Sequence, residues 1–352
     1  MGQNPPLLKK KNYPITSEIK HYLDKYKRLT KTHVLYDDLL RFQGGISVYD
    51  KDGKDTLWIR VFYNEFEKKE IDYSLNKIYT LLHSDGDESK IQFLTVDYID
   101  FCTFGNSKPF RVRIRNILND NYTNFYVKKA DASRVFGLEL EHILSPNRIN
   151  FLVFKDTLIE EHIIGIPGDQ FLIDHLSDCN EHEKAQIAKE FVKFNERCMI
   201  GLLGDMRSYN FVIVTIHDFD NRVFRIRAID FDQQCYEGNF KLYKPHLFKE
   251  NFPFTHLVKH KLNEDAIAQY QKEERSNLVK RMLDSEDRLK DLILAMKSLP
   301  LAPREHIEQL RKEVYDFTLD KHFKKAETMA EIVEVALKFM KRNFRNKDFH
   351  SS

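Results

Sequence analysis

The chain of 352 residues is long enough for two or three domains, or for one two-lobed enzyme with an extension. Lysine and arginine together number 56 and aspartate and glutamate 54, and the formal net charge of +2 is too small to indicate a nucleic-acid or membrane partner. Because the sequence contains no apolar run of membrane-spanning length, no signal-peptide core and no CxxC pair among its four cysteines, we expect a cytoplasmic protein without structural zinc or disulfides.

Residues 1–90 are interpreted as an N-terminal extension. Thr16 or Ser17 can cap a helix whose apolar residues recur at helical spacing. The segments 44–49 and 56–61, separated by a polar turn with Gly53, predict a β-hairpin. A helix that ends near residue 84 completes the extension, and none of these residues indicates a chemical role.

Residues 91–166 predict a small antiparallel sheet with one main helix. The expected strands are 93–101, 110–115, 125–128, 150–154 and 162–166, and a helix precedes Pro146. In the second strand Arg111, Arg113 and Arg115 alternate with apolar residues, which is typical of a half-buried strand. We interpret these arginines as the solvent side of the sheet and not as a polyanion-binding face.

Residues 167–352 are predicted to be mainly helical. A helix over 181–198 is followed by an irregular loop at 201–210 and by a strand pair, 211–216 and 223–229. Helical patterns continue to about residue 345. The order of these elements predicts an α+β fold with two lobes.

The candidate chemistry lies in the irregular loop and just after the strand pair. Asp205 is followed five residues later by Asn210, and Asp230 comes directly after the second strand. Phosphoryl transfer from ATP needs oxygen ligands for Mg²⁺ and a carboxylate that orients the acceptor hydroxyl. A hairpin between Asn210 and Asp230 would bring these two predicted metal ligands together, because its strands start and finish side by side. Arg207 is expected beside the transferring phosphate.

The pattern Gly-Asp-x-x-x-x-Asn followed by Ile-Asp-Phe resembles the protein-kinase-like superfamily, and is most similar to its aminoglycoside and fructosamine phosphotransferase branch. The resemblance covers residues 91–260 and implies a bilobal fold that binds ATP and Mg²⁺. It implies that Lys128 binds the phosphates and that Glu139 positions this lysine. It also implies that a hairpin containing Gly105 and Ser107 covers the phosphates, and that a hinge containing Ile164 and Ile166 lies under the adenine.

The sequence departs from the family pattern at three places. Gly105 is the only glycine in the expected phosphate hairpin, no His or Arg directly precedes Asp205, and Phe-Asp in place of Phe-Gly follows Asp230. The last departure favours a small molecule or sugar over a protein as acceptor.

Two assignments and the acceptor stay open. Lys129 competes with Lys128, and Glu141 competes with Glu139, although strand alternation and the helical face favour the first of each pair. The leading hypothesis is an active kinase for an unknown hydroxyl acceptor, and the alternative is an inactive kinase-like binding protein.

Overall fold

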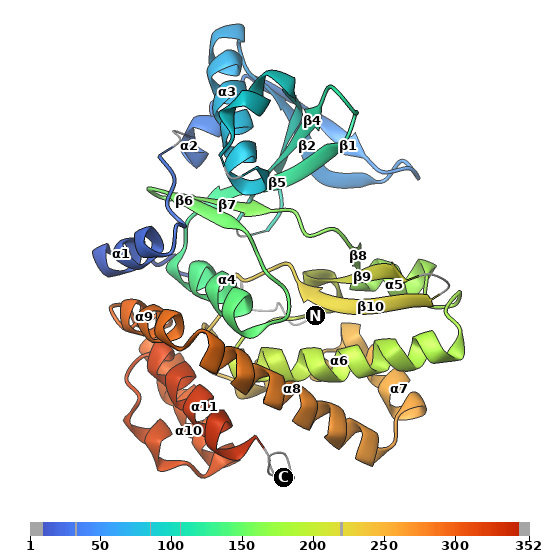
Figure 1. Cartoon of the computed structure of the whole chain (residues 1–352), viewed down its shortest axis with the longest axis vertical. Coiled ribbons are helices and arrows are strands. Elements are labelled where there is room, and N and C mark those ends of the chain that lie inside the picture. Colours follow the sequence, from blue (N-terminus) through green and yellow to red (C-terminus); the bar gives the residue numbers. More distant parts are fainter. Residues whose placement is uncertain (1–9, 32–33, 85, 106, 219–220, 345–352) are drawn as a thin grey trace, which may run out of the picture. The chain divides into compact units, whose positions relative to one another are not determined.

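The computed structural model describes residues 10–31, 34–84, 86–105, 107–218 and 221–344. The chain divides into two compact units, the first comprising residues 1–132 and 150–162 and the second residues 133–149 and 163–352. The elements of both units are drawn in Figure 1. Among the described residues, no helix is long and apolar enough to cross a membrane.

The first unit is built on a seven-stranded antiparallel sheet with the order β1-β2-β3-β4-β5-β7-β6. Its strands are β1 (Gly44–Tyr49), β2 (Asp55–Phe62), β3 (Leu94–Cys102), β4 (Phe110–Asn116), β5 (Tyr122–Lys129), β6 (Phe151–Phe154) and β7 (Thr157–Glu161). Its helices are α1 (Ser17–Lys25), α2 (Tyr36–Leu39), α3 (Glu65–His83) and the 3-10 turn η1 (Glu88–Phe93).

One face of this sheet is packed against α3. Leu75, Ile78 and Leu82 of the helix join a buried cluster with the apolar residues of β4, which include Val112 and Ile114. The helix begins cleanly because the Asn64 side chain accepts a hydrogen bond from the Glu67 backbone at 2.9 Å. The burial of Val112 and Ile114 confirms the alternation that was predicted for β4.

The arginines of β4 lie on the opposite face of the sheet, together with Lys128. Arg111 lies across from Tyr126, which is two residues before Lys128 on β5. Arg111 and Arg60 both bind the carboxylate of Asp100, which is fully buried. Because these arginines are paired with carboxylates, this face of the sheet is not a free basic surface. The pairing agrees with the interpretation that the arginines of β4 do not form a polyanion-binding face.

The second unit is mainly helical and carries a small antiparallel sheet with the order β10-β9-β8. Its strands are β8 (Ile166–Pro167), β9 (Phe211–Asp218) and β10 (Asn221–Ala228). Its helices are α4 (Ala132–Leu144), α5 (Gly168–Asp174), α6 (Glu181–Gly201), α7 (Phe252–Lys261), α8 (Glu264–Asp284), α9 (Glu286–Met296), α10 (Arg304–Thr318) and α11 (Met329–Asn343). Short 3-10 turns are η2 (Ser208–Asn210), η3 (Phe240–Tyr243), η4 (Pro245–Leu247), η5 (Lys249–Asn251) and η6 (Lys321–Lys325).

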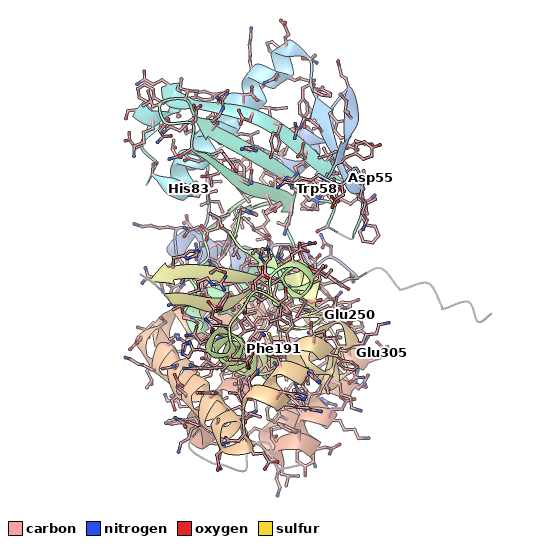
Figure 2. All side chains as sticks on the ribbon, turned by 90° about the vertical axis from the view of Figure 1, so that its right-hand side faces the viewer. Asp55, Trp58, His83, Phe191, Glu250 and Glu305 are labelled. Atoms are coloured by element: carbon pink, nitrogen blue, oxygen red, sulfur yellow. The ribbon has the colours of Figure 1, made fainter. Side chains whose placement is uncertain are left out.

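Helix α6 is the centre of the second unit. A capping box between Asn180 and Glu183 fixes its first turn. Phe191 of α6, labelled in Figure 2, packs against Phe254 of α7 with ring centroids 5.2 Å apart, and Phe211 of β9 contacts the same ring at 5.6 Å. This aromatic cluster joins the middle of α6 to the start of β9, and the irregular loop lies between these two elements.

The structure confirms the predicted α+β class, with a sheet-based part and a mainly helical part, and corrects several boundaries. Strands β1 and β2 of the predicted extension pair in the same sheet as β3, so this part of the extension enlarges that sheet. Most of helix α4 is grouped with the second unit, and α3 packs on the sheet within the first unit. The predicted strand 162–166 is wrong, since β7 ends at Glu161 and the next strand, β8, contains only Ile166 and Pro167.

Candidate functional site

The loop between α6 and β9 is held by backbone hydrogen bonds to later parts of the second unit. The amide of Gly204 donates to the carbonyl of Gln233 at 3.3 Å, and the amide of Asp205 donates to the carbonyl of Leu242 at 3.1 Å. Asp205 adopts a left-handed backbone conformation with φ of 55°, which few residues other than glycine, asparagine and aspartate adopt readily. The loop is therefore held in one conformation, and aspartate suits the left-handed position at residue 205.

Three of the predicted residues meet within this loop. The guanidinium Nε of Arg207 donates to Oδ1 of Asp205 at 2.7 Å. The side-chain amide of Asn210 donates to the backbone carbonyl of Asp205 at 2.7 Å, and its own backbone amide donates to the carbonyl of Arg207 at 2.8 Å. The spacing of five residues thus corresponds to one closed turn, in which Asn210 holds the backbone of Asp205.

The electrostatic surroundings of Asp205 make its carboxyl a better base than an ordinary aspartate. Burial raises the pKa of Asp205 above its ordinary value, and the neighbouring carboxylates of Asp230 and Glu250 raise it further. The hydrogen bond and positive charge of Arg207 oppose this shift. A carboxyl with a raised pKa that is still paired with a cation is suited to accept a proton from a hydroxyl.

The hairpin of β9 and β10 brings Asp230 to the loop, as the sequence predicted. Phe211 pairs with Ala228 at the open end of the hairpin, and the amide of Ile229 donates to the carbonyl of Asn210 at 3.0 Å. Asp230 is the next residue in the chain. Its Oδ1 accepts a hydrogen bond from the amide of Asp232 at 2.9 Å, which fixes the direction of the carboxylate.

Asn210 and Asp230 fit a magnesium ion by the chemistry of their donor atoms. The amide nitrogen of Asn210 is bound to Asp205, whereas its Oδ1 has no partner among the described residues. Carboxylate and amide oxygens are the hard ligands that Mg²⁺ takes in proteins, usually with several waters or phosphate oxygens. No cluster of three or more His, Cys, Asp or Glu side chains able to hold a metal occurs in the described part of the chain, so a site here would depend on ligands from outside the protein.

A buried arginine, Arg134 of α4, also binds the carboxylate end of this site. Its Nη2 donates to Oδ1 of Asp230 at 3.4 Å and to the carboxylate of Asp232. Arg134 is almost completely buried. The positive charge therefore compensates part of the negative charge of Asp230 and Asp232.

In the first unit, Lys128 is paired with a glutamate of the neighbouring strand. Its Nζ donates to Oε2 of Glu160 at 2.6 Å, and both side chains are more than nine-tenths buried. Lys129 is half-exposed and binds Asp37 at 3.4 Å. This difference agrees with the strand alternation that favoured Lys128.

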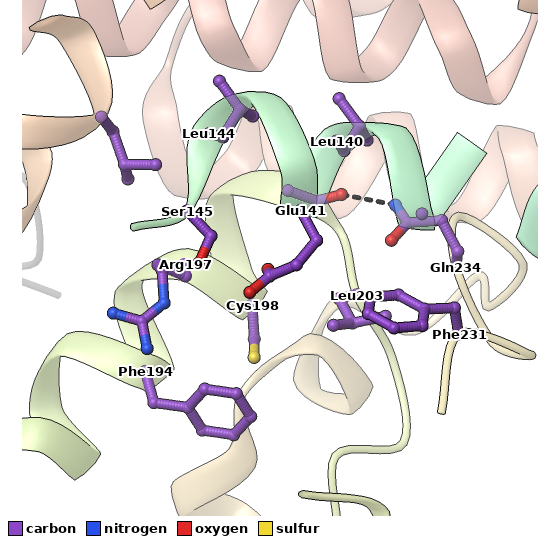
Figure 3. A pocket seen from close by; sticks show the side chains of 13 residues that line it. Leu140, Glu141, Leu144, Ser145, Phe194, Arg197, Cys198, Leu203, Phe231 and Gln234 are labelled. Atoms are coloured by element: carbon purple, nitrogen blue, oxygen red, sulfur yellow. Dashed lines mark hydrogen bonds between the residues drawn. The ribbon is translucent and has the colours of Figure 1, made fainter. Parts of the chain in front are cut away.

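The two glutamates proposed as partners of Lys128 lie in the second unit. The carboxylate of Glu139 is fully buried and accepts hydrogen bonds from Nε and Nη2 of Arg288 at 2.9 and 2.7 Å. Glu141 lines a small pocket between α4 and α6, where Figure 3 shows its carboxylate directed toward the side of Arg197 and Cys198. A pairing of Lys128 with Glu139 would join the two units and stays a prediction.

The remaining predicted residues lie at turns and short elements. Gly105 has a φ of 82° in the loop between β3 and β4, which also contains Ser107, whereas Asn106 of the same predicted turn lies outside the described residues. Ile164 is exposed, and Ile166 pairs with Ile213 in the small sheet of the second unit. The structure therefore brings together Asp205, Arg207, Asn210 and Asp230, and leaves the nucleotide-binding assignments as predictions.

Comparisons with known proteins show only distant similarity, and this comes from solved structures. No family model matches this chain, and no curated protein matches it. Among solved structures, an ethanolamine kinase of Plasmodium vivax is similar to this chain at 12% sequence identity and a TM-score of 0.28, over 82% of this chain and 92% of that chain. A likeness at this level carries no argument for function, and the proposal below rests on the site residues.

Sequence reasoning missed three charged residues of the site and its surroundings: Arg134, Glu160 and Glu250. Arg134 carried a usable signal, because a cation in the first turn of a helix is unfavourable next to the positive end of the helix dipole and needs an acidic partner. Glu160 and Glu250 carried no signal, since their partners are 32 and 43 residues away in sequence.

Proposed function

We propose that this protein is a kinase-like phosphotransferase that uses ATP and Mg²⁺ and transfers the γ-phosphate to a hydroxyl group. The observation that carries the proposal is the joint placement of Asp205, Arg207, Asn210 and Asp230 by one closed loop and one hairpin. Each of these residues alone is unremarkable. Together they supply a base, a cation and two oxygen ligands, which phosphoryl transfer requires.

Each residue has a defined part in this proposal. Asp205 accepts the proton of the acceptor hydroxyl and orients its oxygen, and Arg207 binds the transferring phosphate. Asn210 and Asp230 would hold Mg²⁺, which neutralises phosphate charge when it is bound. Lys128 binds the phosphate chain, with Glu160 as the carboxylate that positions its ammonium group.

The acceptor is proposed to be a small molecule or sugar. Asp230 is followed by Phe231 and Asp232, and Arg134 binds the carboxylates on both sides of Phe231. A segment fixed in this way favours a permanently formed site over a movable activation segment. This supports the small-molecule assignment.

An inactive nucleotide-binding protein is the second candidate, and one observation favours it. Arg134 places a positive charge at Asp230, where the proposed metal ion would also bind. If this arginine replaced the metal, nucleotide binding would not require Mg²⁺.

The first test is nucleotide binding. ATP with Mg²⁺ at about 100 times the dissociation constant should stabilise the protein by about 2.7 kcal/mol. This effect is measured as a rise in melting temperature, and the second candidate predicts the same rise without metal. No rise at saturating ATP contradicts both candidates.

The second test is turnover, measured as release of phosphate or its transfer to a panel of hydroxyl compounds. Asp205→Ala should lose turnover and retain ATP binding, whereas Asp284→Ala, at the exposed end of α8, should keep both. Asp230→Asn should weaken the dependence of turnover on Mg²⁺. Wild-type turnover in Asp205→Ala would contradict the role of that residue.

A further inference from the structure

Residues 248–251 form a short segment that follows the β9–β10 hairpin in the sequence. This segment contacts the loop between α6 and β9, the proposed catalytic loop, at three points. Nη1 of Arg207 donates to Oε1 of Glu250 at 2.7 Å. The ring of Phe248 lies 4.8 Å from the guanidinium carbon of the same arginine. The buried amide of Asn251 donates to the backbone carbonyl of Met206 at 2.8 Å. We call residues 248–251 the clamp segment, and Figure 2 labels its Glu250.

The contacts fix the guanidinium of Arg207 from two sides. Nε is bound to Asp205 and Nη1 is bound to Glu250, each at 2.7 Å. Two carboxylates on different nitrogens define both the position and the plane of a guanidinium group. The third nitrogen, Nη2, has no partner among the residues that the structure describes, so it remains available to a phosphate oxygen.

The negative charge of Glu250 suits it to hold the guanidinium of Arg207. A hydrogen bond from its own backbone amide, supported by the charge of Arg207, holds the pKa of Glu250 below its ordinary value although burial opposes the shift. The carboxylate is therefore negative at neutral pH. Its second oxygen, Oε2, is buried and has no partner among the described residues, which is unfavourable for stability. A locally unfavourable arrangement of this kind is expected at a site that serves function.

We propose that Glu250 is a positioning residue for Arg207. It holds the guanidinium beside Asp205 with one nitrogen directed to the phosphate, and it acts on the reaction only through this arginine. The inference rests on the proposed function, because it assigns Arg207 to the transferring phosphate. Its first consequence, the immobilised guanidinium, can be measured without any turnover.

The first experiment observes the Nε–H group of Arg207 by NMR in the full-length protein. The signal is assigned by its loss in Arg207→Lys, and its exchange with water is then measured. In Glu250→Gln this exchange should become roughly tenfold faster, because a charge-assisted hydrogen bond that restrains the group is lost. Glu308→Gln is the matched control, since it removes the same charge from an exposed pair with Arg304.

Exchange at the wild-type rate in Glu250→Gln would overturn the inference, and so would an equal acceleration in the Glu308→Gln control. Glu250→Asp gives a second variant if the glutamine variant is poorly folded. Its shorter side chain should give an intermediate acceleration, and wild-type exchange in this variant would count against the inference as well.

The second experiment measures turnover of ATP in a double-mutant cycle. Glu250→Gln should lower kcat about tenfold with the KM for ATP within about twofold, because positioning affects the transition state more than nucleotide binding. In an Arg207→Met background the same substitution should have no further effect. An equal additional loss in that background would show that Glu250 does not act through Arg207.

The two proposals can fail separately. Wild-type protein that binds ATP but shows no turnover with any hydroxyl acceptor contradicts the proposed function, whatever the NMR signal does. A mobile Arg207 guanidinium in the wild-type protein, or one unaffected by Glu250→Gln, contradicts the inference about Glu250 even when turnover is observed.

Discussion

Gly168, the first residue of α5, allows a close approach to the loop between α6 and β9, and Gly168→Ala should disturb both stability and turnover. An added Cβ would lie 2.5 Å from Cε2 of Phe211 and 2.6 Å from the backbone carbonyl oxygen of Ser208. Ordinary carbon contacts are about 3.5–4.0 Å long, so the overlap amounts to about 1 Å. Overpacking of this kind costs about 1–3 kcal/mol.

Melting temperature and turnover are the two quantities to measure, because the overlap lies between α5 and the loop that contains Ser208. For a unit of this size, 1 kcal/mol corresponds to a shift in melting temperature of about 2–4 °C. Gly168→Ala should therefore melt about 2–12 °C lower than the wild type. The melting temperature is measured by circular dichroism of the helices. The overlap can be relieved only by moving the backbone at Ser208, between Arg207 and Asn210. A displacement of about 1 Å in the loop should reduce turnover by up to about a hundredfold.

Gly201→Ala is the matched control for this substitution. Gly201 is the last residue of α6, and an added Cβ would meet no atom within 4 Å. We expect it to be neutral or to stabilise by up to about 1 kcal/mol. Equal melting temperatures for the two variants would refute the packing reasoning. A lower melting temperature of Gly168→Ala with normal turnover of the folded protein would refute the link between α5 and the loop.

Two further predictions concern the charged groups. Because burial raises the pKa of Asp205 above the ordinary 3.8 and the group must be ionised to accept a proton, kcat should rise with pH through this raised value. Arg207→Met removes a hydrogen bond and a positive charge that lower the pKa of Asp205, so the rise of kcat with pH should move to higher pH. A rise that moves to lower pH would contradict the assignment of Asp205 as the base. Arg288→Ala removes the bidentate partner of the buried Glu139 carboxylate and should lower the free energy of unfolding, measured in urea, by about 3–5 kcal/mol. The double variant Glu139→Leu with Arg288→Met should recover most of this loss. A double variant as unstable as Arg288→Ala would show that the lost ion pair between Arg288 and Glu139 is not the cause.

The local structure could be predicted wherever a short-range pattern determines it. The alternation in β4 gave both the buried face and the arginine face, and Thr16 caps α1 as expected, since its side chain accepts a hydrogen bond from the amide of Ile19. The closed loop of Asp205 and Asn210 and the hairpin that returns the chain to Asp230 were predicted from the order of the two motifs together with the strands around them. The core of the candidate site was therefore predictable.

The wrong strand after α4 has a local physical cause. Strands β6 and β7 are joined by a two-residue turn, in which Lys155 takes a φ of 52° between the paired residues Phe154 and Thr157. Turns of this kind usually contain Asn or Gly, and Lys-Asp gives no such signal. Sequence reasoning therefore overlooked the turn and moved the strand toward His162.

The position of Arg134 indicated that it needs an acidic partner, but which charged residues pair with one another at the site could not be predicted, for a different reason. The pairs Arg134–Asp230 and Arg207–Glu250 join residues 96 and 43 positions apart. Each depends on which side chains the folded chain brings within bonding distance, and no periodic pattern carries this information. The partner of Lys128 was missed for the same reason, since Glu160 lies 32 residues away, and the strand that carries Glu160 was also misplaced.

The seven-stranded sheet has a practical consequence for anyone who shortens this protein. A chain that began at residue 91 would retain every candidate site residue, and it would lose β1, β2 and α3. Strand β3 would then become an edge with unpaired backbone groups, beside an apolar face that α3 normally covers. Exposed edges of this kind join other chains, so the shortened protein should self-associate before its chemistry can be measured.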